Sequence, residues 1–261
     1  MKLRLGARCV IGGLLALATQ LVGAVEAGTS ASHEPFAGVW QIDSPVFAVR
    51  TMTGEVPPLQ NAAAQVYHRH IAERKQGDTS FDSATWCASV GIPRLMFIDS
   101  PFEIMVGPQH IAFMHEWNWW ARVIYLKGAL SSSVPPLRRP AHIESTGIGI
   151  LPPIENVMTL GPVGLSRGEW VGDELLVTTD HLIDTTLIDS AGLPHSDALK
   201  LTEKFRLRSP DVLEDRIRFE DPQIFTRPWE TVVTYHRKAG ERIHEDVCLD
   251  RIKTGEPAVR E

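Results

Sequence analysis

The last third of the chain carries the pattern that most restricts its fold. Four runs of about eight residues alternate apolar and polar side chains, and turn sequences such as Asp221-Pro222 and Ala239-Gly240 separate them. The runs cover residues 201–208, 212–220, 231–238 and 242–249. Runs of this kind, with no helical segment between them, predict an antiparallel meander. We therefore expect a mainly β protein whose strands form a barrel or sandwich rather than a parallel sheet.

Strand alternation also indicates which side chains share the apolar face of each run. In three runs a carboxylate lies on that face, namely Glu203, Asp215 and Glu245. A buried carboxylate needs an ion pair or a raised pKa, because burying its charge alone is expensive. Two interpretations stay open. The carboxylates form a structural network with Arg122 or Arg237, or they form the polar floor of a ligand cavity.

Further strands are expected upstream. Gly38-Val39-Trp40 begins a short apolar strand, a pattern typical of lipocalin-like barrels, in which the Trp plugs one end; a core Trp in another β protein fits equally well. Strand-like residues follow at 101–106, 109–117 and 121–126. A bend at 118–120 would place Glu116 opposite Arg122 as a cross-strand ion pair. 

Only one upstream segment is expected to be helical. Residues 59–75 are rich in alanine and end at Gly77, which predicts a helix closed by a glycine. The expected architecture is therefore a single antiparallel, lipocalin-like β-barrel with one N-terminal helical excursion. Residues 129–162 are rich in Ser, Pro and Gly without a clear period, and we interpret them as a long irregular loop or lid.

A serine motif offers a competing interpretation. Residues 164–168 match G-x-S-x-G, the nucleophile elbow of α/β-hydrolases, with Ser166 as the nucleophile. That elbow needs a buried strand before the serine and a helix after it. Here glycine and proline precede the serine, and Gly172-Asp173 suits a two-residue hairpin turn, with Trp170 beside Leu175. We expect a hairpin in which Ser166 binds backbone.

Several histidines and tryptophans could line a cavity. His115 and His181 lie in strand-like segments, and His195 lies in a turn beside Ser196-Asp197. Tryptophans near residues 117–120 could form an aromatic mouth or cap the core. The candidate ligand-binding residues are His115, Trp119, Trp120, Trp170, His181 and His195. No histidine or cysteine spacing is typical of a zinc site, so neither a metal nor a cofactor is expected.

The N-terminus indicates export. Basic residues precede an apolar stretch, and small residues around Ala27 suit a signal peptidase, so residues 1–27 are expected to be a cleaved signal peptide that leaves no membrane span. Cleavage removes three basic residues and Glu26, which leaves 23 basic and 31 acidic residues and a net charge of −8. That balance disfavours nucleic acid as a partner. The remaining 28–261 is expected to be one periplasmic or secreted domain, with Cys87 and Cys248 joined in a disulfide.

The motifs taken together resemble a widespread family of exported, β-rich, lipocalin-like bacterial proteins. They are C-x3-G-x-PR-x-M from Cys87, G-x-S-x-G-x-W-x-G-D-x-L from Gly164, G-x-PHSD from Gly192, Asp221-Pro222, and Arg227-Pro228-Trp229. The resemblance covers about residues 38–250. It implies a β-barrel-like domain and no settled activity.

Three functions are compatible with these residues. The first is capture of a small, partly apolar or aromatic molecule inside the barrel, oriented by Glu116, Arg122 and Glu203. The second is a lyase, isomerase or hydratase in the same cavity, in which a carboxylate such as Glu203 moves a proton and Arg122 or His115 stabilises the developing anion. The third is hydrolysis by Ser166. Glu203, Glu116 and Arg122 are thus the candidate catalytic residues, and a small molecule is the expected partner.

Overall fold

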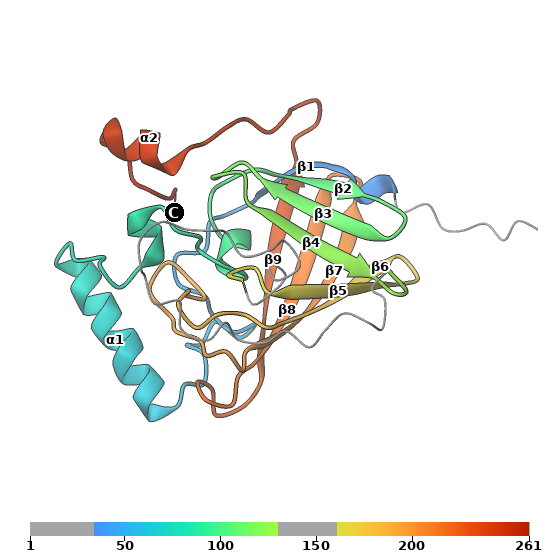
Figure 1. Ribbon diagram of the computed structural model, residues 1–261. Helices are drawn as coiled ribbons and strands as arrows, with labels where there is room; N and C mark the ends of the chain where they lie inside the picture. Colours follow the sequence, from blue (N-terminus) through green and yellow to red (C-terminus); the bar gives the residue numbers. More distant parts are fainter. Residues whose placement is uncertain (1–33, 130–160, 261) are drawn as a thin grey trace, which may run out of the picture. The chain divides into compact units, whose positions relative to one another are not determined.

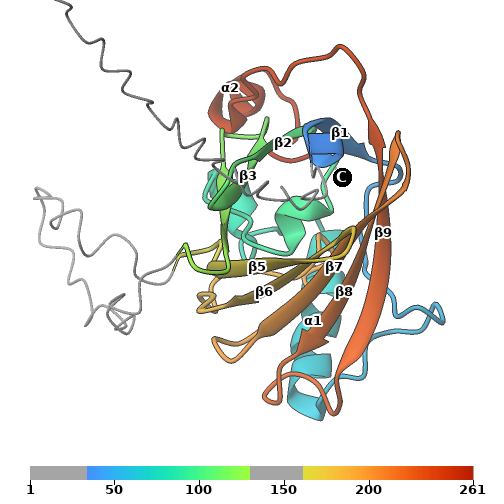
Figure 2. The ribbon, with the colours of Figure 1, turned by 90° about the vertical axis from the view of Figure 1, so that its right-hand side faces the viewer.

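The computed structural model describes residues 34–129 and 161–260. Within these ranges nine strands close into one barrel, and they follow one another around it in chain order (Figure 1). The strands are β1 (Gly38–Ile42), β2 (Phe102–Val106), β3 (His110–His115), β4 (Ala121–Leu126), β5 (Leu165–Val171), β6 (Glu174–Asp180), β7 (Lys200–Ser209), β8 (Val212–Glu220) and β9 (Trp229–Arg237). Figure 2 shows the curved sheet of β5–β9 facing β1–β3 across the interior.

The barrel is mixed rather than wholly antiparallel. Every neighbouring pair is antiparallel except β4 and β5, which run parallel from Ile124↔Ser166 to Leu126↔Gly168. Parallel neighbours require a connection that returns to the end where the first strand began, and the 38 residues between Leu126 and Leu165 are long enough for that return. Most of the predicted loop 129–162 falls in this connection, outside the described residues.

The predicted meander is confirmed for three of its four runs. The runs at 201–208, 212–220 and 231–238 are β7, β8 and β9. The fourth, at 242–249, is not a strand, because β9 already pairs with β1 and this pairing closes the barrel. The chain instead leaves the barrel and forms helix α2 (Cys248–Lys253), so Glu245, which was expected to face inward, is exposed.

The predicted helical excursion is also confirmed. Helix α1 (Asn61–Lys75) buries Ala63 and Tyr67 against the rest of the chain. His70 lies where α1 meets the loop at Gly192: its Nδ1 is 2.7 Å from the Gly192 carbonyl oxygen. Gly192 has a φ of +99°, and a Cβ there would lie 2.6 Å from the Cβ of His70, so only glycine fits this close approach.

One end of the barrel is plugged by Trp40. Its ring is fully buried, and its Nε1 donates to the carbonyl oxygen of Phe36 in the 3-10 helix η1 (Glu34–Phe36) at 3.0 Å. The guanidinium of Arg237, at the end of β9, lies 4.2 Å from the centre of the Trp40 ring. Phe36 in turn meets Trp170 edge to face at 4.9 Å. The burial of Trp40 fits both interpretations of the G-x-W pattern, the plug of a lipocalin-like barrel and a core Trp.

The opposite end is covered by irregular segments, which we call the cap: residues 43–100 and 181–199. It includes α1 and the 3-10 helices η2 (Ser83–Trp86) and η3 (Arg94–Met96) (Figure 1). All three residues of η3 are buried, and the carbonyl oxygen of Met96 accepts a hydrogen bond from the Tyr235 hydroxyl of β9 at 3.1 Å. The cap therefore reaches into the barrel and shields its interior from water.

The predicted disulfide between Cys87 and Cys248 is present, with 5.6 Å between the two Cα atoms. The sequence placed Cys248 in a last strand, at 242–249. The disulfide instead joins the residue after η2 to the first turn of α2. The Cys248 N–H also donates to Asn118 Oδ1 at 2.8 Å. The C-terminal segment is thus attached both to the cap and to the β3–β4 turn. Among the described helices, none is long and apolar enough to cross a membrane.

Removing the disulfide should weaken the protein without unfolding the barrel. The bond links residues 161 positions apart, and closing so long a loop restricts the unfolded chain strongly. We expect a Cys87→Ser, Cys248→Ser variant to lose about 2–4 kcal/mol of unfolding free energy. It should also be cleaved sooner by protease in the segment after Arg237. Urea unfolding and limited proteolysis measure both effects. Equal stability of the variant and the oxidised parent would contradict the expectation.

Candidate binding site inside the barrel

Charged and polar side chains gather in the interior of the barrel. Alternation along β7 and β8 predicts that Glu203 and Asp215 face inward, and both are fully buried. Arg122 of β4 and His115 of β3 are also buried, on the same face of their strands as buried apolar residues. Four potentially charged groups therefore share one enclosed space, which is expensive unless the charges are paired or neutralised.

Arg122 and Glu203 form a buried bidentate ion pair. Arg122 Nη1 donates to Glu203 Oε1 at 2.8 Å, and Nη2 donates to Oε2. The remaining contacts come from β5 and β6: Nε donates to Ser166 Oγ at 3.0 Å and Nη2 to Thr179 Oγ1 at 2.8 Å. Burial disfavours the charge of Arg122, but the Glu203 carboxylate outweighs it and raises the pKa of Arg122. All three nitrogens of this guanidinium therefore donate to protein oxygens, through four hydrogen bonds.

The predicted ion pair between Glu116 and Arg122 is wrong. Arg122 lies opposite Phe113 in the β3–β4 pairing, not opposite Glu116. The turn begins three residues earlier than expected, and an odd shift moves a side chain to the other face of the strand. Glu116 is therefore outside the interior, where its backbone N–H donates to the Pro101 carbonyl at 2.9 Å. It is not a member of the site.

Ser166 belongs to the interior network and not to a nucleophile elbow. The strand that carries it, β5, continues through the Gly172-Asp173 turn into β6, with Trp170 opposite Leu175 as predicted. The sequence predicted that the Ser166 hydroxyl binds backbone, but its hydrogen-bond partners are side chains. The hydroxyl accepts from Arg122 and lies 2.8 Å from Thr179 Oγ1, and neither group can act as a base toward it. Ser166 therefore orients Arg122.

Asp215 differs from Glu203 because its carboxyl oxygens have no hydrogen-bond partner among the described residues, although the side chain is fully buried. Burial raises the pKa of Asp215 well above its usual value, and the nearby Glu203 carboxylate raises it further. The raised pKa favours the neutral carboxyl form of Asp215, which donates one hydrogen bond and accepts others.

His115 is the second buried group without a partner. Neither ring nitrogen is hydrogen-bonded within the part of the chain that the structure describes. Burial lowers the pKa of His115 to about 3, and the positive charge of Arg122 acts in the same direction. The ring is therefore neutral at pH 7, with one donor and one acceptor nitrogen.

Aromatic rings separate these polar groups. Phe102 lies 5.1 Å from His115 and 5.1 Å from Tyr235, measured between ring centres, and 5.6 Å from Phe113. Phe113 continues the contact to Phe205, at 5.3 Å. Asp215 pairs with Phe205 in the β7–β8 register, so both unpartnered groups border this row of rings. We call the four residues Phe102, Phe113, Phe205 and Tyr235 the aromatic belt.

Five of the six candidate ligand-binding residues do not line this space: His195, which lies in the cap, and four others. Trp119 lies in the β3–β4 turn with 42% of its surface exposed, and Trp120 packs against the core only in part. Trp170 lies at the plugged end of the barrel, beside Phe36. His181 follows β6 at the surface, where its Nδ1 is 2.6 Å from Asp180 Oδ1. Sequence alternation could not place them because three of the four lie in turns or at strand ends.

Several pockets formed by the described residues lie outside the barrel. One of about 460 Å³ is lined by outward-facing side chains of β4, β5 and β6, including Tyr125, Arg167 and Leu176. Its lining does not include Asp215 or His115. The side chains of Asp215 and His115 are themselves fully buried from solvent. No group of three His, Cys, Asp or Glu side chains gathers in a metal-binding arrangement within residues 34–129 and 161–260.

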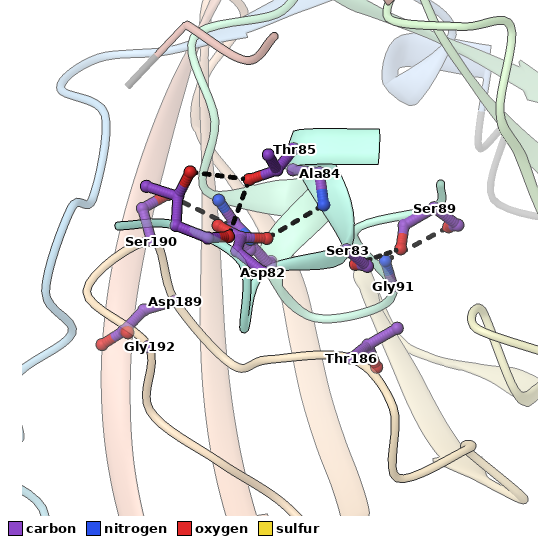
Figure 3. Close-up of polar contacts among 12 residues, drawn as sticks. Asp82, Ser83, Ala84, Thr85, Ser89, Gly91, Thr186, Asp189, Ser190 and Gly192 are labelled. Atoms are coloured by element: carbon purple, nitrogen blue, oxygen red, sulfur yellow. Dashed lines mark hydrogen bonds and ion pairs between the residues drawn. The ribbon is translucent and has the colours of Figure 1, made fainter. Parts of the chain in front are cut away.

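A second polar cluster holds the cap together, and sequence reasoning did not find it (Figure 3). Its centre is the buried Asp82, whose Oδ1 accepts from Arg94 Nη1 at 2.6 Å and from the Ala84 N–H at 3.0 Å. Arg94 Nε also reaches Ser190 Oγ at 3.2 Å. The neighbouring Asp189 accepts from the N–H of the distant Val49 and from the N–H of Leu193, four residues further along its own loop, and burial raises its pKa.

His195 belongs to the cap and not to the barrel interior. Its Nδ1 donates to the Ser196 carbonyl at 3.0 Å, so its Nε2 accepts from Thr186 Oγ1, 2.8 Å away. Thr186 lies against Gly91, where a Cβ would lie 2.6 Å from the Thr186 hydroxyl oxygen. The motifs G-x-PR and G-x-PHSD, 100 residues apart, therefore meet in the cap. Their joint presence in the sequence was the available signal for this cluster.

Removing the charge of Glu203 should be costly. A guanidinium does not lose its proton in proteins, so Glu203→Gln leaves Arg122 charged in an interior without its counter-charge. We expect the free energy of unfolding to fall by about 3–5 kcal/mol. The matched control is Glu230→Gln, which removes the partner of Arg216 on the outer face of the same sheet, 2.6 Å away. It should cost less than about 1 kcal/mol. Similar costs for the two variants in urea unfolding would contradict a structural role for the buried pair.

Asp215→Asn should change how stability depends on pH. A raised pKa in the folded state means that folding favours the protonated carboxyl, so this contribution is complete below about pH 4 and is lost as the pH rises toward the folded-state pKa. Relative to the parent, the variant should gain up to about 1.4 kcal/mol for each pH unit above 4. Urea unfolding from pH 4 to pH 8 measures the difference. Glu230→Gln, on the outer face of β9, is the control, and parallel curves for the parent and Asp215→Asn would contradict the raised pKa of Asp215.

Comparison with known proteins gives no match: no family model fits this chain, and no curated protein matches it significantly. The resemblance noted from the sequence motifs stays a prediction.

Proposed function

We propose that the protein is an exported, lipocalin-like barrel that binds one small, partly apolar molecule in its interior. The observation that carries this proposal is the pair of fully buried side chains, Asp215 and His115, whose polar atoms have no partner in the described parts of the chain. Each buried group without a partner costs about 1–3 kcal/mol. Natural proteins break the rule of polar satisfaction mainly at functional sites.

The architecture supports this proposal. A barrel with one end plugged by Trp40 and η1 has the arrangement expected of a lipocalin-like container. The aromatic belt supplies an apolar wall of the kind that small-molecule sites use. Export is supported by the N-terminal sequence and by the Cys87–Cys248 disulfide, because disulfides persist in oxidising compartments.

The cap determines how a ligand is held. Because η3 is buried in the covered end of the barrel and Tyr235 bonds to it, a molecule inside would be enclosed on all sides. Entry and release then require the cap to move, so the ligand should leave slowly. A ligand retained through purification is the expected result.

Proton transfer on the bound molecule is the second candidate function. It is favoured by the opposite pKa shifts of two groups in one interior: Asp215 is raised and His115 is lowered. The raised pKa favours an Asp215 that holds its proton, and the lowered pKa leaves His115 as a neutral base that is free to take one. This assigns proton movement to Asp215 and His115, not to Glu203, which is occupied by Arg122.

Native mass spectrometry of the protein purified from the cells that make it tests binding directly. We expect a mass above that of the chain, lost on denaturation. Asp215→Val should remain folded, because an apolar side chain removes two unsatisfied oxygens, but it should lose the extra mass. Glu214→Gln, one residue away on the outer face, should keep it.

One outcome would contradict binding, and a second would contradict the role of Asp215 in it. One is a native mass equal to that of the chain alone. The other is an Asp215→Val variant less stable than the parent that still retains the ligand, because Asp215 would then have a structural role. Incubating the released molecule with fresh protein separates the two candidate functions: an unchanged mass and structure of that molecule favours binding, and a changed structure favours proton transfer.

A further inference from the structure

The interior also restricts the charge of the molecule it can hold. Resting on the proposed function, we infer that the ligand is an uncharged ring compound carrying a hydroxyl or carbonyl group, which hydrogen-bonds to Asp215 and His115. The inference follows from which interior groups are already bonded within the protein and which are not.

The interior offers no cation to an anionic ligand. Among the described residues, the buried guanidinium inside the barrel is that of Arg122, and all three of its nitrogens already donate to protein oxygens. Its charge is compensated by Glu203 at bonding distance. A carboxylate or phosphate placed beside Asp215 would meet a second negative group in Glu203 and no free positive one. Burying that charge without compensation is strongly unfavourable.

A cationic ligand is disfavoured for a related reason. It would need Asp215 to ionise, yet Asp215 is fully buried and already feels the negative charge of Glu203. His115 offers no negative charge. The hydroxyl of Tyr235 is engaged with the Met96 carbonyl, 3.1 Å away. The charges inside the barrel therefore balance without a ligand, and an uncharged molecule preserves that balance.

The two unpartnered groups select a particular kind of polar atom. A protonated carboxyl donates one hydrogen bond and accepts others, and a neutral imidazole does both with different nitrogens. A ligand hydroxyl can donate to and accept from both Asp215 and His115, whereas a ligand carbonyl can only accept from their donor groups. The aromatic belt, which borders both groups, suits a flat ring, because ring faces and edges pack well against aromatic side chains.

Matched probes that share a ring and carry a neutral, an anionic or a cationic group test this inference. One set is 2-naphthalenemethanol, 2-naphthoate and 2-naphthylmethylammonium; the single-ring set is benzyl alcohol, benzoate and benzylammonium. Equilibrium dialysis at pH 7 against ligand-free protein measures the affinity of each probe. The alcohol of at least one set should bind ten-fold or more tightly than its two charged counterparts. Asp215→Asn, which is neutral and keeps a donor and an acceptor, should retain the alcohol within about three-fold, whereas Asp215→Val should weaken it ten-fold or more. Glu214→Gln should change nothing.

The outcomes separate this inference from the proposed function. Tighter binding of the naphthoate or the ammonium overturns the uncharged ligand while leaving binding intact. Loss of the alcohol in Asp215→Asn does the same, because it would mean that Asp215 acts as an anion. If neither probe set binds but a molecule is retained from the cells, the charge of that molecule at pH 7 decides, and an ionised molecule refutes the inference. If nothing is retained and nothing binds, the proposed function itself fails.

Discussion

The buried ion pair between Arg122 and Glu203 is the constraint on which the interior depends. It joins β4 to β7 across the barrel, and through Ser166 and Thr179 it also holds β5 and β6. Four strands therefore meet at one guanidinium. A buried pair of this kind adds little net stability compared with apolar residues, but it is intolerant of any register in which one partner is missing. It thereby specifies how the strands align, including the parallel β4–β5 pair.

Much of the fold could be predicted from the sequence because strand alternation and turn residues are local signals. The β7–β9 meander, the Gly172-Asp173 hairpin and the inward positions of Glu203 and Asp215 all follow from residues close together in the chain. The failures depend on distant partners. Glu116 was misplaced because the expected bend at 118–120 was too short: residues 115–120 separate the paired Met114 and Ala121. The segment 242–249 alternates like a strand but has no free edge to pair with.

The candidate site divides in the same way. Sequence alternation could place a carboxylate inside the barrel, but it could not show that Arg122 pairs with Glu203 rather than with Asp215. Nor could it show that His115 lacks a partner, since hydrogen bonding depends on groups from several strands. The cap cluster around Asp82 was beyond prediction because its members come from loops, whose paths no periodic pattern records.

The pairing of β1 with β9 has a consequence for how the chain matures. It joins Trp40 to Arg237, so nearly the whole described chain lies between the two strands that close the barrel. Contacts between residues so distant in sequence form slowly, because the entropy of closing the loop must be overcome first. A growing chain cannot complete the barrel until its ninth strand has been synthesised. The buried pair also joins distant residues, because Arg122 is synthesised 81 residues before Glu203. Water solvates the charge of Arg122 until β7 is in place.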